Sequence, residues 1–191
     1  MTSSPSERLH KPVHAYIAAG GNLGPVLELL DWVRIQLENR TRSLVKCSRA
    51  YRTRAHVLPG VSGPVPDYWN CVFELETSLR PLVLLKSLLK LETEQGRVRL
   101  HRWEPRALDL DLVLYGQWTV CHRDLVVPHP RMYERRFVLE PLHELNPRLT
   151  IPGAPGTLNS RLEQLRLTAP DDILNVRDFQ YRRKGMILNT G

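Results

Sequence analysis

The sequence has few of the features that mark secreted, disulfide-rich or membrane proteins. It has three cysteines in 191 residues (Cys47, Cys71 and Cys121), and no two of them show the spacing of a metal site. No apolar run approaches the roughly 20 residues that a membrane-spanning helix needs. The first dozen residues are polar and have no apolar centre, so they do not read as a signal peptide. We therefore expect a cytoplasmic protein with reduced thiols and no membrane partner.

Acidic residues are also scarce relative to basic ones. The chain has 20 Asp and Glu against 27 Lys and Arg, which gives a net charge of +7 and a pI near 9.7. Such a charge suggests an anionic partner, which can be nucleic acid, a nucleotide or another phosphorylated small molecule. Basic residues are spread along the chain, and their one dense cluster lies at 97–106.

The bulk composition is that of a globular protein, with 42% hydrophobic and 25% charged residues. Its length fits one domain. We expect a disordered leader over residues 1–12, a single domain over 13–167 and a C-terminal tail over 168–191.

Periodicity and turn residues predict an alternation of strands and helices. The expected strands are 15–19, 43–53, 70–77 and 108–115 with an edge at 117–120, and the expected helices are 25–37, 81–93, 131–141 and 157–165. A long Pro- and Gly-rich loop is expected over 54–67. Pro141 should stop or kink the third helix. The order strand, helix, strand, strand, helix, strand predicts an α+β fold, a ferredoxin-like split β-α-β sheet with packed helices in α/β/α layers.

Two aspartates two residues apart lie in the predicted strand 108–115. Side chains alternate along a strand, so Asp109 and Asp111 share one face, with their backbones roughly 7 Å apart. Two carboxylates this close invite divalent cations, and the arginines just before them can bind an anion. Such a pair alone is more often a solvated strand edge, but the preceding basic loop favours a metal role in phosphoryl chemistry.

Four ordered blocks of residues resemble the 6-hydroxymethyl-7,8-dihydropterin pyrophosphokinase family. They are Ala19–Gly24; Tyr51–Thr53 with Pro66–Asn70; Glu92 with Gln95–Arg99 and Arg102–Asp111; and Val127–His129 with Arg135 and Phe137. Each block is weak alone, and the set covers about residues 14–153. The resemblance implies transfer of a pyrophosphoryl group from ATP to the pterin hydroxymethyl group in folate biosynthesis, releasing AMP. It also implies two Mg²⁺ ions, ATP and a pterin as small-molecule substrates, and a monomer that binds no nucleic acid.

The resemblance also assigns roles to individual residues. Asp109 and Asp111 would hold the two Mg²⁺ ions, and Arg97 and Arg106 would contact phosphate in catalysis, which suits the planar fork of arginine. The implied nucleotide contacts are Glu92, Arg99, Arg102, Trp103, Leu112, His129 and Arg135. The implied pterin contacts are Thr53, Tyr68, Asn70, Trp103 and Phe137.

Some positions depart from the family pattern. Gly21 replaces the usual serine, Arg54-Ala55 replaces prolines, and Glu104 replaces the usual glycine before Pro105. We expect a divergent but active enzyme. One alternative is a nucleotide- or pterin-binding relative with impaired catalysis. The other is a nucleic-acid-binding α+β module, motivated by the charge of +7; its strands offer only Tyr16 and Phe73 as stacking aromatics.

Overall fold

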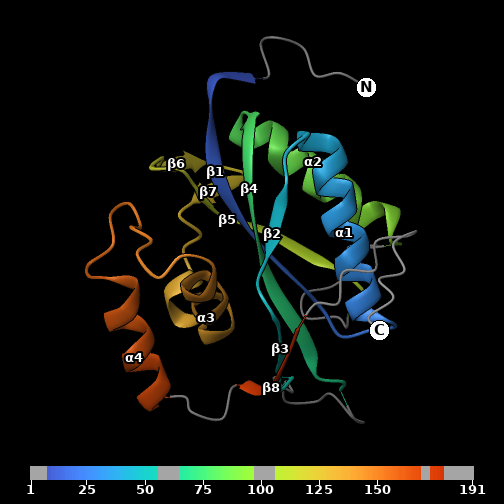
Figure 1. Ribbon diagram of the computed structural model, residues 1–191, viewed down its shortest axis with the longest axis vertical. Helices are drawn as coiled ribbons and strands as arrows, with labels where there is room; N and C mark the ends of the chain where they lie inside the picture. Colours follow the sequence, from blue (N-terminus) through green and yellow to red (C-terminus); the bar gives the residue numbers. More distant parts are fainter. Residues whose placement is uncertain (1–7, 56–64, 97–105, 169–172, 179–191) are drawn as a thin grey trace, which may run out of the picture.

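The computed structural model describes residues 8–55, 65–96, 106–168 and 173–178. In chain order its elements are β1 (Arg8–Gly21), α1 (Val26–Thr41), β2 (Val45–Cys47), β3 (Ala50–Thr53), β4 (Tyr68–Leu79), α2 (Pro81–Glu94), β5 (Asp109–Tyr115), β6 (Val120–His122), β7 (Leu125–Val127), a 3₁₀ turn (Met132–Glu134), α3 (Arg136–Leu145), α4 (Leu158–Thr168) and β8 (Ile173–Arg177). Figure 1 shows them around one central sheet.

The central sheet is antiparallel and runs in the order β5-β1-β4-β3-β8, with β2 also paired to β4. Strand β1 lies between β5 and β4, so each of the two helix connections crosses over a neighbouring strand. That is the split β-α-β arrangement, and the predicted α+β fold is confirmed. Strands β6 and β7 form a separate two-stranded hairpin.

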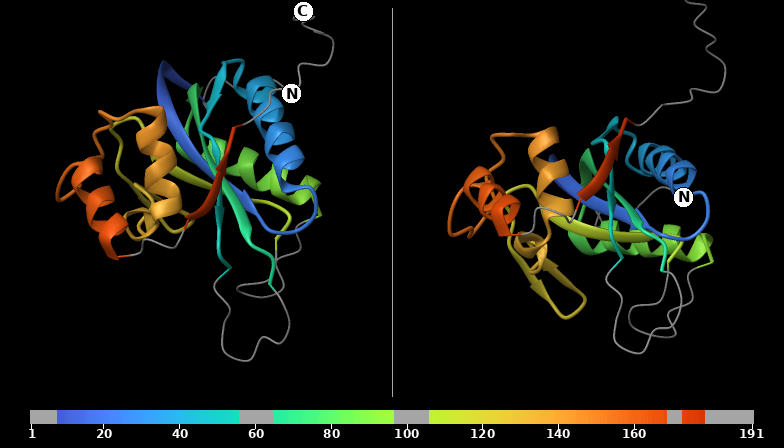
Figure 2. Two further views of the ribbon diagram at one scale, coloured as in Figure 1. Left: turned by 60° about the horizontal axis from the view of Figure 1, so that its bottom comes forward. Right: turned by 90° about the horizontal axis from the view of Figure 1, so that it is seen from below.

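Helices cover both faces of the sheet, which gives three layers (Figure 2). Helices α1 and α2 pack on one face against Ile17, Phe73 and Leu112, and α3 and α4 pack on the other face against Tyr16 and Val72. Successive residues of β1 and β4 therefore belong to different cores. This follows from strand alternation in a sheet that is buried on both sides.

The first two helices follow the predicted periodicity. Their buried apolar side chains recur at three- and four-residue intervals, and they are Val26, Leu30, Val33 and Leu37 in α1 and Leu84, Leu88 and Leu91 in α2. Pro81 occupies the first turn of α2, where its missing N–H has no intrahelical partner to lose. Both predictions are confirmed, with each helix slightly longer than expected.

Some predicted elements differ in detail. The strand expected over 43–53 is split into β2 and β3, because Ser48 turns toward β4: its N–H donates to the Val72 carbonyl (3.0 Å) and its Oγ accepts from the Val72 N–H (3.0 Å). Pro141 does not stop its helix. Helix α3 continues through it to Leu145, since the proline is buried with Val138 and Leu142 against the sheet. Packing thus outweighs the hydrogen bond that proline cannot make.

Both ends of the described chain extend further into the sheet than expected. Residues 8–12, predicted as part of a disordered leader, belong to β1, and Arg8 is in register with Leu79. Residues 173–177, predicted as tail, form β8 and pair with β3. Edge strands add to a sheet through backbone hydrogen bonds, which a polar sequence makes as well as an apolar one.

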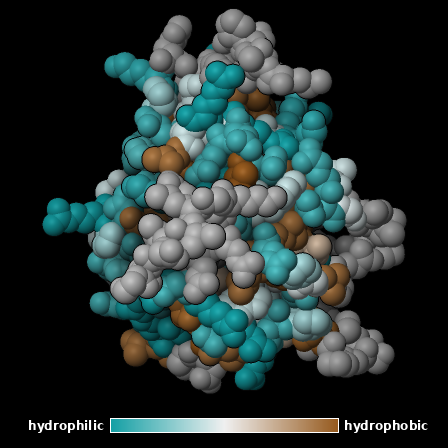
Figure 3. Space-filling model, turned by 45° about the vertical axis from the view of Figure 1, so that its right-hand side comes forward, coloured by the Kyte–Doolittle hydropathy of each residue, from teal (hydrophilic) through white to brown (hydrophobic). Residues whose placement is uncertain are grey.

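No helix in the described ranges is long and apolar enough to cross a bilayer. On the side shown in Figure 3, apolar side chains form separate small patches among hydrophilic ones. Scattered apolar surface of this kind is normal for a globular protein.

Glu140 on α3 provides a pH-dependent link to α4. Its carboxylate accepts bonds from Arg136 (3.0 Å) and Arg166 (2.9 and 2.6 Å) and is 12% exposed. Burial alone would raise the pKa of Glu140, but the two guanidinium groups outweigh burial and lower it. A lowered pKa means that ionised Glu140 stabilises the fold above its unfolded pKa and that this contribution is lost as the pH falls through the folded pKa.

We predict that Glu140→Gln lowers the free energy of unfolding by about 2 kcal/mol at pH 7. The difference from the wild type should shrink as the pH falls below the ordinary glutamate pKa of about 4.3. Urea denaturation at several pH values measures this difference. Glu163→Gln, which removes an exposed carboxylate of α4, is the matched control. A pH-independent difference would contradict the prediction.

Candidate active site

Predicted site residues of β4 and β5 lie on the α3 face, at one end of the sheet. Gly20 near the end of β1 is in register with Asp109 of β5 on one side and with Asn70 of β4 on the other. Asn70 is in turn in register with Tyr51 of β3. The antiparallel register thus places the aspartates and Asn70 on the same face, separated by the backbone of β1.

Gly20 leaves room for the side chain of Asn70. A Cβ at position 20 would lie 2.5 Å from Asn70 Oδ1, which is closer than any normal contact. The Asn70 amide lies across the glycine and donates to Thr53 Oγ1 at 2.9 Å. The sequence prediction did not single out Gly20. A glycine inside a strand pattern, which often marks a close approach of another group, was the available signal.

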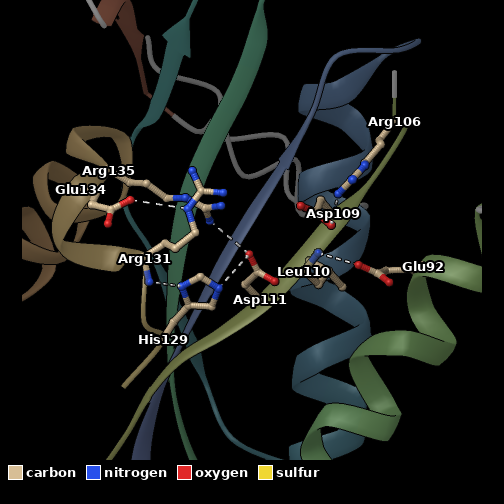
Figure 4. A network of polar contacts seen from close by, with 9 residues as sticks. All are labelled: Glu92, Arg106, Asp109, Leu110, Asp111, His129, Arg131, Glu134 and Arg135. Atoms are coloured by element: carbon tan, nitrogen blue, oxygen red, sulfur yellow. Dashed lines mark hydrogen bonds and ion pairs between the residues drawn. The ribbon is translucent and has the colours of Figure 1, made fainter. Parts of the chain in front are cut away.

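Asp109 and Asp111 point to the same side of β5, as predicted, and each faces an arginine (Figure 4). Arg106 Nη1 lies 3.0 Å from Asp109 Oδ1, and Arg135 Nη1 lies 3.5 Å from Asp111 Oδ2. The two carboxylate side chains are 35% and 37% exposed, so neither is sealed from ligands.

His129 approaches Asp111 from the segment after β7, with its Nε2 3.9 Å from Asp111 Oδ2. The backbone N–H of His129 donates to the Val113 carbonyl at 2.9 Å, and the ring Nδ1 accepts from the Arg131 N–H at 3.2 Å. Burial lowers the pKa of His129, and Asp111 opposes that shift. The His129 ring is therefore fixed in orientation, with its Nε2 facing the Asp111 carboxylate.

Glu92 supports the same strand from the opposite side. It is 2% exposed, and its carboxylate accepts from the Leu110 N–H at 2.8 Å, between the two aspartates (Figure 4). The Leu110 N–H therefore points away from β1. Because strand alternation repeats every two residues, the backbone N–H of Leu112 points to the same outer edge of β5. The Leu112 side chain itself is buried in the core.

A family model for 7,8-dihydro-6-hydroxymethylpterin-pyrophosphokinase (HPPK) matches residues 16–147, which include the whole site face described above. The chain belongs to this family. It is 41% identical over 156 residues to 2-amino-4-hydroxy-6-hydroxymethyldihydropteridine pyrophosphokinase of Synechocystis, covering 81% of this chain and 77% of that protein. The namesake of Haemophilus influenzae is 41% identical over 143 residues, covering 74% and 87% of the two chains.

Solved structures share the fold. A crystal structure of Plasmodium falciparum HPPK-DHPS with pterin and p-hydroxybenzoate superposes with a TM-score of 0.64 at 12% identity, over 86% of this chain and 46% of that one. The present chain thus spans slightly under half of that bifunctional protein. At this identity the likeness concerns the fold alone, and the match confirms the α+β HPPK architecture.

The pterin and nucleotide residues predicted from the family resemblance divide into two groups. In the first group, which the structure describes, Tyr68 is half-buried; burial raises its pKa, and the charges of Arg106 and Asp109 act on it. Phe137 lies under the Arg135 guanidinium, 5.8 Å from ring centre to carbon. Four other predicted residues (Arg97, Arg99, Arg102 and Trp103) lie outside the described residues, as does Glu104.

The donor set at the site suits Mg²⁺. Within the described ranges no group of three or more His, Cys, Asp and Glu side chains converges. Mg²⁺ does not need such a cage, because it keeps several waters and takes phosphate oxygens beside one or two carboxylates. Asp109 and Asp111 offer partly exposed oxygens on one face, so the residues present fit the ion.

A cavity of about 430 Å³ lies on the other side of the sheet and is separate from this site. Leu23, Pro25, Leu29 and Trp32 near the start of α1 line it, together with Gln95 and Ala107. Among the residues that the structure describes, no predicted ligand-binding side chain lines this cavity. We place the candidate site at the carboxylate face because the chemistry-bearing residues converge there.

The contact between Glu92 and Leu110 gives a prediction for the local stability of β5. Glu92→Ala removes the acceptor of the Leu110 N–H and should speed hydrogen exchange of that amide by about tenfold or more. Glu92→Gln keeps an oxygen acceptor and should change exchange less. Exchange measured by NMR tests this, with Glu94→Ala, which removes an exposed carboxylate paired to Arg40 at 3.1 Å, as the control. Unchanged Leu110 exchange in Glu92→Ala would contradict the prediction.

Proposed function

We propose that this chain transfers the pyrophosphoryl group of ATP to the hydroxymethyl group of 6-hydroxymethyl-7,8-dihydropterin and releases AMP, a step of folate biosynthesis. The observation that carries the proposal is the row of site residues in an HPPK-family fold: Asp111 and Asp109 with their arginines on one side of Gly20, and Asn70 with Thr53 on the other. One side offers charges for a triphosphate, and the other offers a neutral amide for a heterocycle.

The nucleotide binds along the outer edge of β5. The Leu112 N–H points to this edge between Glu92 and His129, so it can pair with an adenine ring as another strand would. Glu92 acts by holding the edge through the Leu110 N–H. Arg106, Arg135 and His129 then lie on the carboxylate side, where the phosphates carry negative charge.

Asp109 and Asp111 would hold two Mg²⁺ ions together with phosphate oxygens. Bound there, the ions neutralise charge on the triphosphate and on the attacking oxygen. Arg106 and Arg135 already compensate these carboxylates at 3.0 and 3.5 Å, and they are within reach of phosphates that approach the same face. Catalysis in this class depends mainly on positioning and electrostatics. Arg97, Arg99, Arg102 and Trp103 remain proposed contacts from the family resemblance.

The pterin binds on the Asn70 side. Asn70 Oδ1 lies over Gly20 on the site face while its Nδ2 donates to Thr53, which fixes the orientation of the amide. Tyr68 lies two residues before Asn70 and faces the same way, and Phe137 supplies a ring for stacking. The hydroxymethyl group would then point toward Asp109, across the backbone of β1.

The alternative of a nucleic-acid-binding module fits the structure less well. Such a sheet binds RNA through exposed aromatic rings on its central strands. Here helices cover both faces, and Tyr16 and Phe73 are 3% and 0% exposed. The alternative of a catalytically impaired relative is decided by the assay below.

We also propose the cellular setting. We propose that the active protein is a monomer, as the family resemblance implies. Strands β1 to β5 and β8 share one sheet, and we propose that it forms the frame of one catalytic unit. Cys47, Cys71 and Cys121 form no disulfide, which agrees with action in the cytoplasm, where thiols stay reduced.

The first test is direct. Purified protein with ATP, Mg²⁺ and 6-hydroxymethyl-7,8-dihydropterin should release AMP, and Asp109→Asn and Asp111→Asn should each lower kcat by about 10²-fold or more, since each removes a charge that the transition state needs. Asp124→Asn, in the exposed β6–β7 turn, should keep full activity. Absence of AMP release with the wild-type protein would refute the proposed pyrophosphokinase activity.

Gly20→Ala tests the pterin side separately. The added Cβ would displace the Asn70 amide, so KM for the pterin should rise by about tenfold while KM for ATP changes little. Steady-state kinetics in each substrate separate the two effects. Gly156→Ala, where the Cβ meets only the flexible Ser160 hydroxyl, is the control. Equal changes in both KM values would place Asn70 outside the pterin site.

A further inference from the structure

Asn22 is a buried polar residue to which neither the sequence prediction nor the mechanism above gives a role. It directly follows β1 and is 5% exposed. Its Oδ1 accepts from the Arg106 N–H at 2.8 Å, and its Nδ2 donates to the Pro66 carbonyl at 3.2 Å. Because an N–H only donates and a carbonyl only accepts, these partners fix the orientation of the amide.

The backbone around Asn22 adds further hydrogen bonds to Arg106. The Asn22 N–H donates to the Arg106 carbonyl at 2.9 Å, and the Leu23 N–H donates to it at 3.3 Å. Both polar groups of the Arg106 backbone are therefore bound by this one turn. Gly21 adds to the fit, since a Cβ there would collide with the Ala107 carbonyl.

The two contacts of the Asn22 side chain lead to opposite sides of the site. Arg106 is paired with Asp109 and precedes β5, which carries the aspartates. Pro66 precedes β4, which carries Tyr68 and Asn70. The Asn22 side chain thus links the segment that leads into β5, on the phosphate side, to the segment that leads into β4, on the pterin side. It does so at the end of β1, the strand that lies between β4 and β5.

We propose that Asn22 is a positioning residue for pyrophosphoryl transfer. It fixes the backbone of Arg106, before β5, relative to the backbone of Pro66, before β4, so that the two substrates meet in line. This rests on the proposed function, because positioning matters only if both substrates bind here. In reactions that depend on orientation, a small displacement of residues away from the reacting atoms can lower the rate substantially. Asn22 touches no reacting atom and is not a catalytic residue.

Two substitutions separate its contacts. Asn22→Ala removes both, and kcat should fall by about 10- to 100-fold, with weaker binding of both substrates. Asn22→Asp keeps an acceptor for the Arg106 N–H but turns a carboxylate oxygen toward the Pro66 carbonyl. It should retain slow hydrogen exchange at the Arg106 amide and weaken binding of the pterin about fivefold or more, with a smaller change for MgATP.

The experiment combines steady-state kinetics, calorimetric titration of the intact protein with MgATP and with 6-hydroxymethyl-7,8-dihydropterin, and NMR hydrogen exchange. Asn146→Ala is the matched control, because Asn146 also makes side-chain hydrogen bonds, to Tyr16 and Arg148, but at the far end of α3. It should lower thermal stability while leaving kcat and both dissociation constants unchanged.

The outcomes are separable. Wild-type protein without AMP release would refute the proposed function, whatever the variants do. Active wild type with unchanged kcat and dissociation constants in Asn22→Ala would overturn the positioning role, as would changes matched by Asn146→Ala. If Asn22→Ala does not fold, the isosteric Asn22→Asp decides: equal effects on both substrates, or none, would overturn the proposal.

Discussion

The candidate site depends on the register of one strand. Strand β1 lies between β5 and β4, and Gly20 is paired with Asp109 on one side and Asn70 on the other. Neighbouring strands are about 4.8 Å apart, so the backbones that carry these two residues are separated by roughly 10 Å. A shift of β1 by one residue would reverse which of its side chains face α3, and Gly20 would no longer lie between Asp109 and Asn70. The spacing between the anionic and the heterocyclic side of the site is therefore a property of the sheet.

Charge at the site is balanced before any substrate arrives. Asp109 and Asp111 would repel each other across two strand positions, but Arg106 and Arg135 lie beside them. These pairs are about one-third exposed, so water screens them and each contributes little to stability. Weak pairing suits a binding site, because the carboxylates and guanidinium groups can exchange partners for metal ions and phosphates at low cost. The same groups buried as tight pairs would resist such an exchange.

The parts of the structure that local sequence determines were predictable, and the parts that depend on distant contacts were not. Periodic apolar residues gave α1 and α2, and alternation put Asp109 and Asp111 on one face. The break at Ser48 depends on Val72, and β8 exists because β3 offers an edge. Gly20 was missed for the same reason: its requirement for no side chain comes from Asn70, fifty positions away, and only the register of the sheet brings them together.

Two buried polar side chains hydrogen-bond to the backbone just before and within β5. The Glu92 carboxylate, near the end of α2, accepts a hydrogen bond from the Leu110 N–H, and Asn22 Oδ1 accepts one from the Arg106 N–H. A buried acceptor is retained only when it is paired, because an unpaired one costs about 1–3 kcal/mol. Each hydrogen bond therefore pairs a buried side chain and at the same time fixes the backbone at the start of β5. The first residues of β5 are thus anchored by side chains from α2 and from the end of β1, independently of any segment that binds ligand. Backbone anchored in this way keeps the two carboxylates of β5 in place, as a reaction that depends on positioning requires.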